Sequence, residues 1–545
     1  MEFNHLLLNH SLTKNTLANL KSGKSTCITG LDNSRLIYFI GNIVQGLDKN
    51  ILLIAHDNYH LMRYYEDLIR LVEEERVIIY PEIEILPHEQ IVADMHELGE
   101  RLSVLEEVVF KRDSSKIILV TVETLMRKMM PVDKFRDYSL KIGIGTEVDL
   151  HNISSRLTTL GYERVNMVED QGQYSIRGGI LDIFTISAAK PYRVELFGDE
   201  IDSIREFDTV TQRSETNIEE IIVSPAREII LLSDQIQKAV SLIENDFREA
   251  VENLKRLGNK DEALYLNEKM NESLEKLQEM HEFPGYEQFL PYFFQELDTF
   301  LDYIPENTLL FLDQTEKIWY NIKKYEKETA DTQATLLEQG SVIPSYIDNF
   351  QTATGILKQI KVFKSVFFFS RFTETPLLKK QDNINFDTRG VEPFHGKVEM
   401  LAERLEELVR KKYRTVITLN STSKARRITE FLKEKNLPVY FKEGAYNRGD
   451  IIVRAGSLAE GFVFEDLNLY VYTEKEVFGK KQKRKSQIKE LEDGVKISSI
   501  NELNIGDYVV HENHGIGKYL GVKTMEIQDQ HLDYLVIKYA GEDKL

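Results

Sequence analysis

Residues 172–208 read GQYSIRGGILDIFTISAAKPYRVELFGDEIDSIREFD, and this stretch decides the fold of the part of the chain around it. Apolar and polar residues alternate along it, and the alternation breaks only at turn residues such as Gly198–Asp199. This pattern is typical of a small antiparallel sheet with one buried and one exposed face. We therefore expect two strands, 192–197 and 201–207, joined by a tight turn.

The first of these strands is expected to divide its side chains between two faces. One face carries Tyr192, Val194 and Leu196, and the other presents three side chains to solvent: Arg193, Glu195 and Phe197. The return strand is expected to place four residues on one face: Ile201, Ser203, Arg205 and Phe207. An arginine, a glutamate and a phenylalanine on a solvent face are typical of a protein docking surface. A solvated strand face with one exposed aromatic explains the same pattern, and the residues alone leave both interpretations open.

The composition indicates a folded chain of several domains in a reducing compartment. The 545 residues suffice for about three to five domains, and 42% hydrophobic residues support packed cores. No stretch approaches the roughly 18 apolar residues that cross a membrane, and the N-terminal residues lack the pattern of a secretion signal. A single cysteine, Cys27, excludes an intrachain disulfide and a cysteine zinc site. We therefore expect a cytoplasmic protein without a membrane partner.

The net charge of −20 argues against a protein that grips duplex DNA over its whole surface, because such a surface would repel phosphates. Any contact with DNA must come from a local basic patch or from a part of the protein outside this chain. The most basic run, KKQKRK at Lys480–Lys485, is interpreted as a solvated linker. We expect this chain to contribute little to DNA binding.

The order of the expected elements indicates a multidomain α/β protein. Short apolar strands alternate with amphipathic helices across residues 25–125, which predicts a parallel α/β sheet. The period-two stretch then predicts an antiparallel α+β domain inserted into this first α/β domain. A second α/β domain follows, and its expected strands include Lys361–Ser370. The expected boundaries are 1–128 and 216–335 for the two parts of the first domain, 129–215 for the inserted domain, 345–475 for the second α/β domain of unassigned role, 476–500 for a linker, and 501–545 for a β-rich module.

A nucleotide site would need a loop of the form GxxxxGK[ST] between a strand and a helix, because its backbone amides and lysine hold the phosphates. Gly23-Lys24-Ser25 precedes its strand and lacks the first glycine. The loop after the strand 25–30 opens a helix, but aspartate stands where a glycine is needed and asparagine where the lysine is needed. The positions of this degenerate loop are Gly30, Asp32, Asn33 and Ser34.

The partner motif of a nucleotide site is eroded as well. The strand 308–313 ends in Asp313-Gln314, where an enzyme that hydrolyses ATP would carry Asp-Glu to hold magnesium and orient water. We interpret Asp313 as a strand-end or cap residue. The sequence therefore predicts no catalytic residue and no bound cofactor in this segment.

The C-terminal module begins with IGDYVVHENHGIGKYLG at residues 505–521. Short strands are expected around glycine corners, one of them a tight turn at Gly515–Gly517. This pattern predicts a small β-barrel of the Tudor or SH3 type, left incomplete at residue 545. His511 and His514 have no third ligand at a suitable spacing, so we predict no metal site.

Several motifs resemble one known family. The stretch 172–208, YPEIEILPHEQ at Tyr80–Gln90 and ERLSVL at Glu100–Leu105 are similar to the UvrB-like part that the excision-repair protein UvrB shares with transcription-repair coupling factors. Residues 505–521 and YTEKEVFG at Tyr472–Gly479 are similar to the CarD-like, polymerase-interacting domain of the coupling factors. Both domains in this order, with the eroded phosphate loop, resemble the N-terminal portion of the coupling-factor family. The resemblance implies a degenerate RecA/UvrB-like first domain and a longer parent protein.

The resemblance also implies two binding surfaces. In that family the inserted domain binds UvrA, and the surface facing UvrA would comprise Arg164, Arg177, Arg193, Glu195 and Phe197. The polymerase-interacting domain binds the β subunit of RNA polymerase by strand addition, and the candidates for that contact are Thr524, Met525, Ile527, Tyr534 and Val536. We also expect Arg193→Ala to weaken UvrA binding without unfolding the domain.

The function implied by the resemblance is a non-catalytic recruitment scaffold, which links stalled RNA polymerase to UvrA in transcription-coupled nucleotide excision repair. ATP, magnesium and most DNA contacts would belong to the motor domains, absent here, of a DNA translocase. One alternative is a UvrB-like, ATP-dependent helicase of excision repair, which stabilisation by ATP would reveal. Another is a structural adaptor of transcription without a repair role, which a UvrA binding assay would separate.

Overall fold

The computed structural model divides the chain into two compact units, Met1–Gly479 and Lys480–Leu545, and each is described by itself. The described residues are 7–22, 24–47, 49–83, 85–89, 95–111, 115–230, 232–279, 283–378, 383–441, 447–456 and 458–479 in the first unit, and 508–511, 515–527 and 530–538 in the second. Residues 480–500 of the predicted linker, which include the basic run Lys480–Lys485, lie outside the described residues. Within the described part, none of the helices is both long and apolar enough to cross a membrane.

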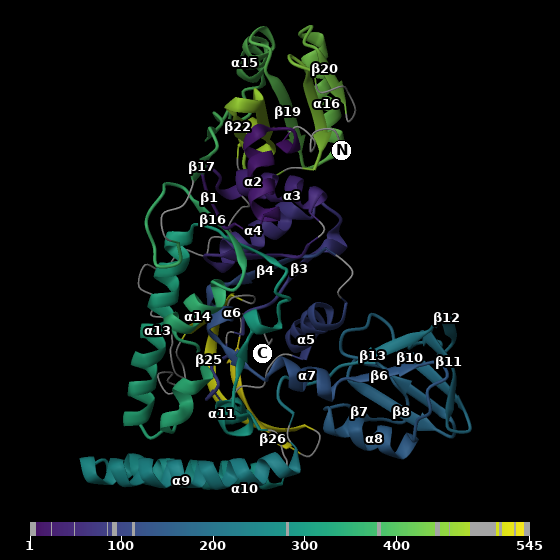
Figure 1. The fold of residues 1–545 in the computed structure, drawn as a ribbon, viewed down its shortest axis with the longest axis vertical. Helices are drawn as coiled ribbons and strands as arrows, with labels where there is room; N and C mark the ends of the chain where they lie inside the picture. Colours follow the sequence, from purple (N-terminus) through teal and green to yellow (C-terminus); the bar gives the residue numbers. More distant parts are fainter. Residues whose placement is uncertain are drawn as a thin grey trace. The chain divides into compact units, whose positions relative to one another are not determined.

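Seven of the described strands form one parallel sheet in the first unit (Figure 1). Their order is β17 (Asn383–Asn385), β1 (Thr26–Thr29), β16 (Lys364–Phe369), β15 (Leu309–Leu312), β2 (Ile51–Ala55), β4 (Ile117–Thr121) and β3 (Val77–Ile79). Strands β1, β2, β4 and β15 are buried along their whole length, as expected for a parallel sheet that is covered on both faces. The predicted parallel α/β sheet is confirmed.

Alternate residues of β2 enter two separate hydrophobic cores, because successive side chains of a strand point to opposite faces. Leu52 and Ile54 belong to a core that also contains side chains of α5 (Met95–Phe110) and α13 (Thr315–Glu338). Leu53 belongs to the other core, with side chains of α3 (Asn33–Ile43) and α4 (Asn58–Leu68). The main sheet therefore separates the two cores.

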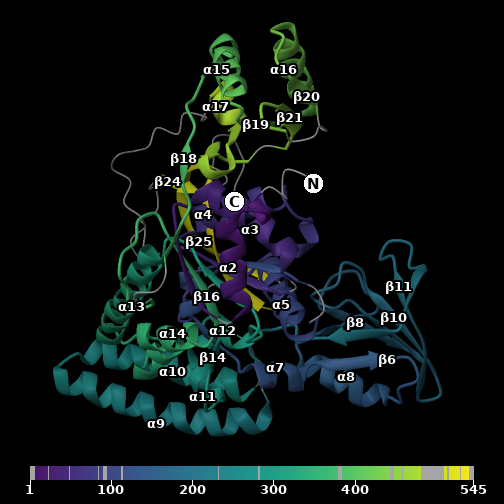
Figure 2. The same ribbon diagram turned by 45° about the horizontal axis from the view of Figure 1, so that its top comes forward.

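Two long helices lie side by side in the segment before β15: α9 (Ser233–Leu257) and α10 (Lys260–Gln278) (Figures 1 and 2). They are joined at Gly258, whose φ of 93° is the left-handed conformation in which glycine ends a helix at little cost. Their buried side chains, such as Ile243 and Leu266, belong to the same core as Leu52. The chain then re-enters the main sheet at β15, as the sequence predicted.

One strand predicted for the second α/β domain belongs to the main sheet. β16 lies between β1 and β15 and pairs with both in parallel, so that Val366 stands opposite Thr26 on one side and Phe311 on the other. The assignment of Lys361–Ser370 to the domain 345–475 is therefore wrong. An apolar run indicates a buried strand, but its pattern does not tell which sheet the strand joins.

The second sheet of the first unit begins at β18. Its order is β18 (Thr388–Gly390), β22 (Phe462–Phe464), β23 (Leu469–Thr473), β19 (Arg414–Leu419), β21 (Ile451–Ala455) and β20 (Val439–Phe441). The last four strands are mutually parallel, whereas β22 is antiparallel to both of its neighbours. The amphipathic helices predicted next to it are α15 (Val398–Arg410) and α16 (Thr422–Glu434).

The second sheet shares a core with the main sheet. The ring centroids of Phe462 and Phe464 lie 5.3 and 5.8 Å from that of Tyr38 in α3. All three side chains are buried in the core that contains Leu53. The two α/β domains therefore pack on each other through α3.

The inserted domain contains a sheet of six described strands. Its order is β12 (Ser214–Ile218), β11 (Glu200–Phe207), β10 (Tyr192–Phe197), β9 (Ile180–Ile183), β8 (Gln173–Arg177) and β7 (Glu163–Arg164). Neighbouring strands are antiparallel except β7 and β8. Gly198 and Asp199 join β10 to β11, so the predicted hairpin is confirmed.

The second strand of this hairpin differs from its predicted facing. The register shifts between Glu195 and Leu196, because β11 contains one extra residue in a β-bulge. Ile201 and Ile204 are therefore both buried in the core of the domain, whereas Ser203 lies opposite Glu195. The prediction that Ile201 and Ser203 share a face is wrong, since regular alternation carries no sign of the bulge.

The second unit contains three described strands in antiparallel order: β24 (Tyr508–His511), β25 (Gly515–Ile527) and β26 (Gln530–Lys538). The tight turn expected at Gly515–Gly517 is wrong, because these residues open β25, where Gly517 pairs with Val509. The module is β-rich as predicted, and its closure into a Tudor-type barrel stays a prediction.

Candidate functional site

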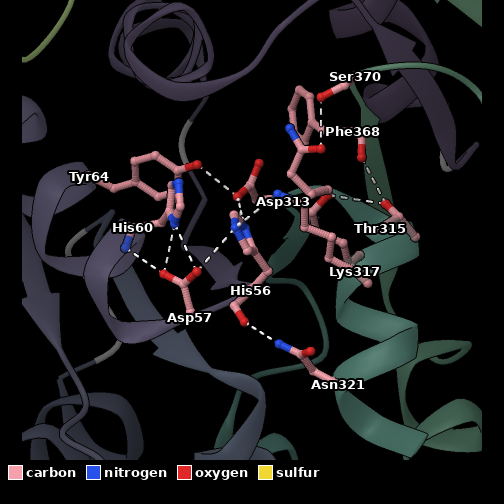
Figure 3. A network of polar contacts seen from close by, with 12 residues as sticks. His56, Asp57, His60, Tyr64, Asp313, Thr315, Lys317, Asn321, Phe368 and Ser370 are labelled. Atoms are coloured by element: carbon pink, nitrogen blue, oxygen red, sulfur yellow. Dashed lines mark hydrogen bonds and ion pairs between the residues drawn. The ribbon is translucent and has the colours of Figure 1, made fainter. Parts of the chain in front are cut away.

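The carboxyl ends of β1, β16, β15 and β2 meet at one edge of the main sheet, which is where open α/β folds bind ligands. Three of these strands are followed directly by polar residues: β2 by His56, β15 by Asp313 and β16 by Ser370. The fourth, β1, is followed by the degenerate loop that begins at Gly30. Figure 3 shows the polar network at this edge.

The degenerate loop is closed by contacts inside the protein. Gly30 has a φ of 83°, and a Cβ atom there would overlap the carbonyl oxygen of Phe386. The carboxylate of Asp32 pairs with the guanidinium of Arg35, which also donates to the hydroxyl of Thr388 at 3.5 Å. Thr388 in turn donates to the carbonyl oxygen of Gly30. The loop is thus tied to β18, the first strand of the second sheet.

Ser34 connects the same loop to the second sheet through buried hydrogen bonds. Its hydroxyl donates to Asp67 at 2.7 Å and accepts from the backbone N–H of Glu460 at 3.1 Å. Asp67 also accepts from the N–H of Ala459 at 2.8 Å, and burial raises the pKa of this carboxyl to about 6. Asn33, at the position of the missing lysine, begins α3 with a φ of 46°. The hydroxyl that would bind magnesium in an intact loop is here part of a joint between the two α/β domains.

Asp313 follows β15 and is fully buried. Its Oδ2 atom lies 2.8 Å from Nδ1 of His56 and accepts from the hydroxyl of Tyr64 at 2.7 Å (Figure 3). Burial and the charge of Asp313 raise the pKa of Tyr64 well above its usual range, which keeps the phenol a donor. Among the described residues, Oδ1 of Asp313 has no hydrogen-bond partner. The predicted strand-end position is confirmed, but the carboxylate binds side chains and does not cap α13.

His56 extends this network to Asp57 and Lys317 (Figure 3). Its Nε2 atom lies 3.3 Å from the carboxylate of Asp57 and 3.4 Å from the ammonium nitrogen of Lys317. Asp57 caps α4 by accepting from the backbone N–H of His60 at 2.7 Å, and Nδ1 of His60 lies 2.7 Å from the same oxygen. Burial opposes the ionisation of Asp57, but the hydrogen bonds from His60 outweigh it and lower the pKa. Asp57 is thus an anion that contacts both imidazole groups.

Sequence reasoning missed His56, His60 and Tyr64 as members of this network. His56 and Asp313 are 257 positions apart, and no alternation pattern connects them. The signal that would have found His56 is positional, because polar residues that follow buried parallel strands converge at one sheet edge.

The predicted UvrA-facing residue Arg193 is held in place by its own domain. Its Nε and Nη2 atoms donate to the two carboxylate oxygens of Asp182 at 2.7 and 2.9 Å, and these hydrogen bonds raise the pKa of Arg193. Its guanidinium lies over the ring of Phe207 at 4.6 Å and also donates to the carbonyl of Gln212 at 3.1 Å. The side chain of Arg193 is 17% exposed and that of Asp182 1%. The outward phase of Arg193 is confirmed, but its charge is already paired.

Four of the five predicted residues share the face that carries Arg193. Ile180 of β9 pairs with Arg177 on one side and with Glu195 on the other, so these three form one row. Glu195 accepts from the hydroxyl of Ser203 and is only partly exposed. Phe197, two residues beyond Glu195, is 85% exposed at the end of β10.

Arg164 lies apart from the other four. It stands on the edge strand β7, where it pairs with Tyr174. The side chain of Tyr174 is buried in the core of the inserted domain, on the face opposite to Arg177. The structure therefore brings together Arg177, Arg193, Glu195 and Phe197 and leaves Arg164 at the margin.

The residues predicted to contact RNA polymerase lie on two paired strands. Thr524, Met525 and Ile527 are in β25, and Tyr534 and Val536 are in β26. β24 pairs with β25 only over residues 515–518. Among the described residues, the part of β25 from 522 to 527 is therefore paired on one side only, by β26.

Two family models match the chain, each within one of these regions. The model of the UvrB interaction domain matches residues 140–229, and the model of the CarD-like/TRCF RID domain matches residues 503–545. The first match covers the sheet that carries Arg193, and the second covers β24, β25 and β26.

Curated relatives match almost the whole chain. The chain is 32% identical to the transcription-repair-coupling factor of Bacillus subtilis over 96% of its length, and 29% identical to those of Staphylococcus haemolyticus and Staphylococcus aureus over 95% and 96%. It spans 44% of the length of each of these relatives. A solved structure described as XPD_Helicase aligns with 82% of this chain and over 79% of its own length, at 10% identity. Its TM-score of 0.24 is too low to show a shared fold. With both domain models matched in order and 96% of the chain aligned to a curated relative, the resemblance predicted from the sequence is confirmed: this chain is related to the transcription-repair-coupling factors and carries their UvrB interaction and CarD-like domains.

Proposed function

We propose that this chain is the recruitment scaffold of a bacterial transcription-repair coupling factor, and that it links stalled RNA polymerase to UvrA in transcription-coupled nucleotide excision repair. The observation that carries the proposal is the presence of both matched domains on one chain, in the family's order. A scaffold of this kind needs two separate binding surfaces, and each can be tested by itself.

The proposed surface for UvrA is the sheet face that carries Arg177, Ile180 and Glu195 in one row, with Phe197 at the end of β10. Its charged side chains would steer the encounter and set the register of binding, while the exposed ring of Phe197 would supply much of the affinity. Arg193 would act by holding this face in shape through Asp182.

Titration of the chain with purified UvrA tests this surface. We expect Phe197→Ala to weaken binding by about 10-fold or more, since buried aromatic anchors dominate such interfaces. Tyr320→Ala is the matched control, because Tyr320 is an aromatic side chain, 66% exposed, on α13 outside the inserted domain. Equal affinity of both variants and the unchanged chain would refute the assignment of the surface.

The proposed surface for RNA polymerase is the half-paired part of β25. A strand with unpaired backbone groups can accept a further strand, and alternate side chains then set specificity. We propose that the β subunit is the partner and that Thr524, Met525, Ile527, Tyr534 and Val536 flank the contact. A titration with the β subunit should show weaker binding for the double variant Met525→Ala, Ile527→Ala, with UvrA binding unchanged. An unchanged affinity for the polymerase would argue against strand addition at this strand.

We propose that this chain does not itself use ATP. The degenerate loop lacks the lysine, carries Asp32 and is tied to Thr388 and Glu460. The translocase activity of the family, with its ATP, magnesium and DNA, would reside in the part of the relatives that this chain does not span. A melting experiment with magnesium and excess ATP separates this scaffold from a UvrB-like helicase, because a bound ligand raises the melting temperature. We expect no shift, and a shift that depends on ATP concentration would favour the helicase.

A further inference from the structure

Three potential metal ligands lie together where β2 ends and α4 begins: His56, Asp57 and His60 (Figure 3). One ligand atom from each lies within 4.8 Å of the other two. We propose that these three residues bind a divalent transition-metal ion of the zinc class.

The choice of ligands fits that class of ion. Two imidazole nitrogens and one carboxylate oxygen are donors that zinc and its neighbours prefer, whereas magnesium and calcium prefer sites made of oxygen atoms. Asp57 uses one oxygen, Oδ1, to cap α4, and its Oδ2 atom lies 3.3 Å from Nε2 of His56. The carboxylate is therefore able to cap the helix and bind an ion with different oxygens.

A second observation, independent of the cluster, supports the site. Histidine ligands of metals usually donate their other ring N–H to a carboxylate, which fixes the tautomer and turns the bare nitrogen toward the ion. Nδ1 of His56 lies 2.8 Å from the fully buried carboxylate of Asp313, so Nε2 is left as an acceptor on the side of Asp57. The tautomer of His56 needed for metal binding is therefore set by the core of the protein.

The dimensions require a local adjustment. A tetrahedral zinc ion with bonds of about 2.0–2.1 Å places its ligand atoms roughly 3.4 Å apart. The ligand atoms of this cluster lie within 4.8 Å of one another, so they must approach by up to about 1.4 Å. The two imidazole rings, with centroids 4.1 Å apart, already lie against each other, so a rotation of the partly exposed His60 would close the site.

The local charge also favours a cation. The carboxylates of Asp57 and Asp313 both contact His56, and the nearby positive charge is the ammonium of Lys317, 3.4 Å from Nε2. Lys317 is exposed, so its ammonium group can move away when an ion binds. Lys317 thus competes with the metal for the same lone pair of His56.

The test is equilibrium dialysis of the whole chain, free of any polyhistidine tag, against zinc chloride. We expect one zinc ion per chain. Asp57→Asn keeps an N-cap but removes the charged ligand, and His60→Gln removes a ligand at the surface. Each should weaken zinc binding by at least about tenfold. Lys317→Met should strengthen it by about three- to tenfold, because a competing charged hydrogen bond is lost.

His151→Gln provides the matched control. Asp149 caps α8 (Leu150–Thr159) and accepts from the backbone N–H of His151 at 2.9 Å, which gives an exposed histidine the same kind of helix start without the second imidazole. Zinc binding should be unchanged in this variant. Cobalt(II) in place of zinc should give a visible absorption spectrum that disappears in His60→Gln. The proposal is overturned if the chain binds no zinc, or if Asp57→Asn and His60→Gln bind it as well as His151→Gln does.

Discussion

The guanidinium of Arg193 and the carboxylate of Asp182 face each other on adjacent strands and share two hydrogen bonds of 2.7 and 2.9 Å. Asp182 is buried, so this carboxylate depends on Arg193 for its main charged partner. The second arginine near it, Arg177, reaches one carboxylate oxygen at 3.0 Å from a largely exposed position. The two arginines of the proposed docking face therefore differ in how strongly they are held by Asp182.

Arg193→Ala should destabilise the inserted domain, contrary to the expectation from strand phase alone. Removing Arg193 leaves the buried carboxylate of Asp182 with the largely exposed Arg177 as its charged partner, and we expect a loss of about 2–4 kcal/mol in the free energy of unfolding. Arg177→Ala should cost no more than about 1 kcal/mol, because the Arg177 side chain is largely exposed and Asp182 keeps its two hydrogen bonds from Arg193. Urea unfolding followed by circular dichroism measures both. Equal stability of the two variants would mean that Arg193 is a free docking residue after all.

Asp67 should make the joint between the two α/β domains more stable at acidic pH. Burial raises the pKa of this carboxyl from 3.8 to about 6, so the folded chain binds the proton more tightly than the unfolded chain does. The stabilisation is fully present below about pH 4 and is lost as the pH rises through about 6. It amounts to at most about 3 kcal/mol.

The check on Asp67 is the difference in unfolding free energy between the unchanged chain and Asp67→Asn, measured from pH 4 to 7. The difference should shrink as the pH rises, since the asparagine has no proton to lose. A difference that is constant over this range would show that Asp67 titrates as it does in water.

Tyr64→Phe should destabilise the carboxyl edge of the main sheet. The phenol donates to Asp313 at 2.7 Å, and its loss leaves this buried carboxylate with His56 as its remaining side-chain partner among the described residues. Hydrogen bonds to charged groups contribute about 1.5–3 kcal/mol, which is the loss we expect on thermal or urea unfolding. Tyr59→Phe, at a tyrosine 65% exposed on the same helix, is the control and should be neutral.

Introducing the glycine and the lysine of an intact phosphate loop at positions 32 and 33 should not create ATP binding. In the double variant Asp32→Gly, Asn33→Lys, the hydroxyl of Ser34 stays bound to Asp67 and Glu460, and Thr388 still donates to the carbonyl of Gly30. We expect no heat of binding in calorimetry with magnesium and ATP. Measurable binding would show that the two substitutions, and not the contacts with the second sheet, separate this loop from a working one.

The sequence predicts the structure best where one local rule decides the outcome. The alternation in 172–208 and the turn at Gly198 lead to the observed hairpin, because a strand with one buried face has a strict period of two. The erosion of the loop at Asp32 and Asn33 is equally visible, since a phosphate loop needs particular residues at particular positions. The two family models match the regions that were recognised from their sequence motifs, residues 140–229 and 503–545.

Contacts between segments that are distant in the chain could not be predicted from the sequence. β16 is as apolar as any buried strand, and only its register with β1 and β15 places it in the main sheet. Arg193 has the outward phase that a docking residue needs, but its phase does not reveal the buried Asp182 beside it. The meeting of His56 with Asp313 depends on the order of strands in the sheet, which no local pattern encodes.

The buried joint at Ser34 has a mechanical consequence. Domains that open and close during a reaction cycle keep few buried contacts between them, because each contact must break at every opening. Here the hydroxyl of Ser34 is bound by the carboxylate of Asp67 and the backbone N–H of Glu460, and buried aromatic rings from both α/β domains pack together. A force applied to one of the two α/β domains would therefore be transmitted to the other, and the two would move as a single rigid body.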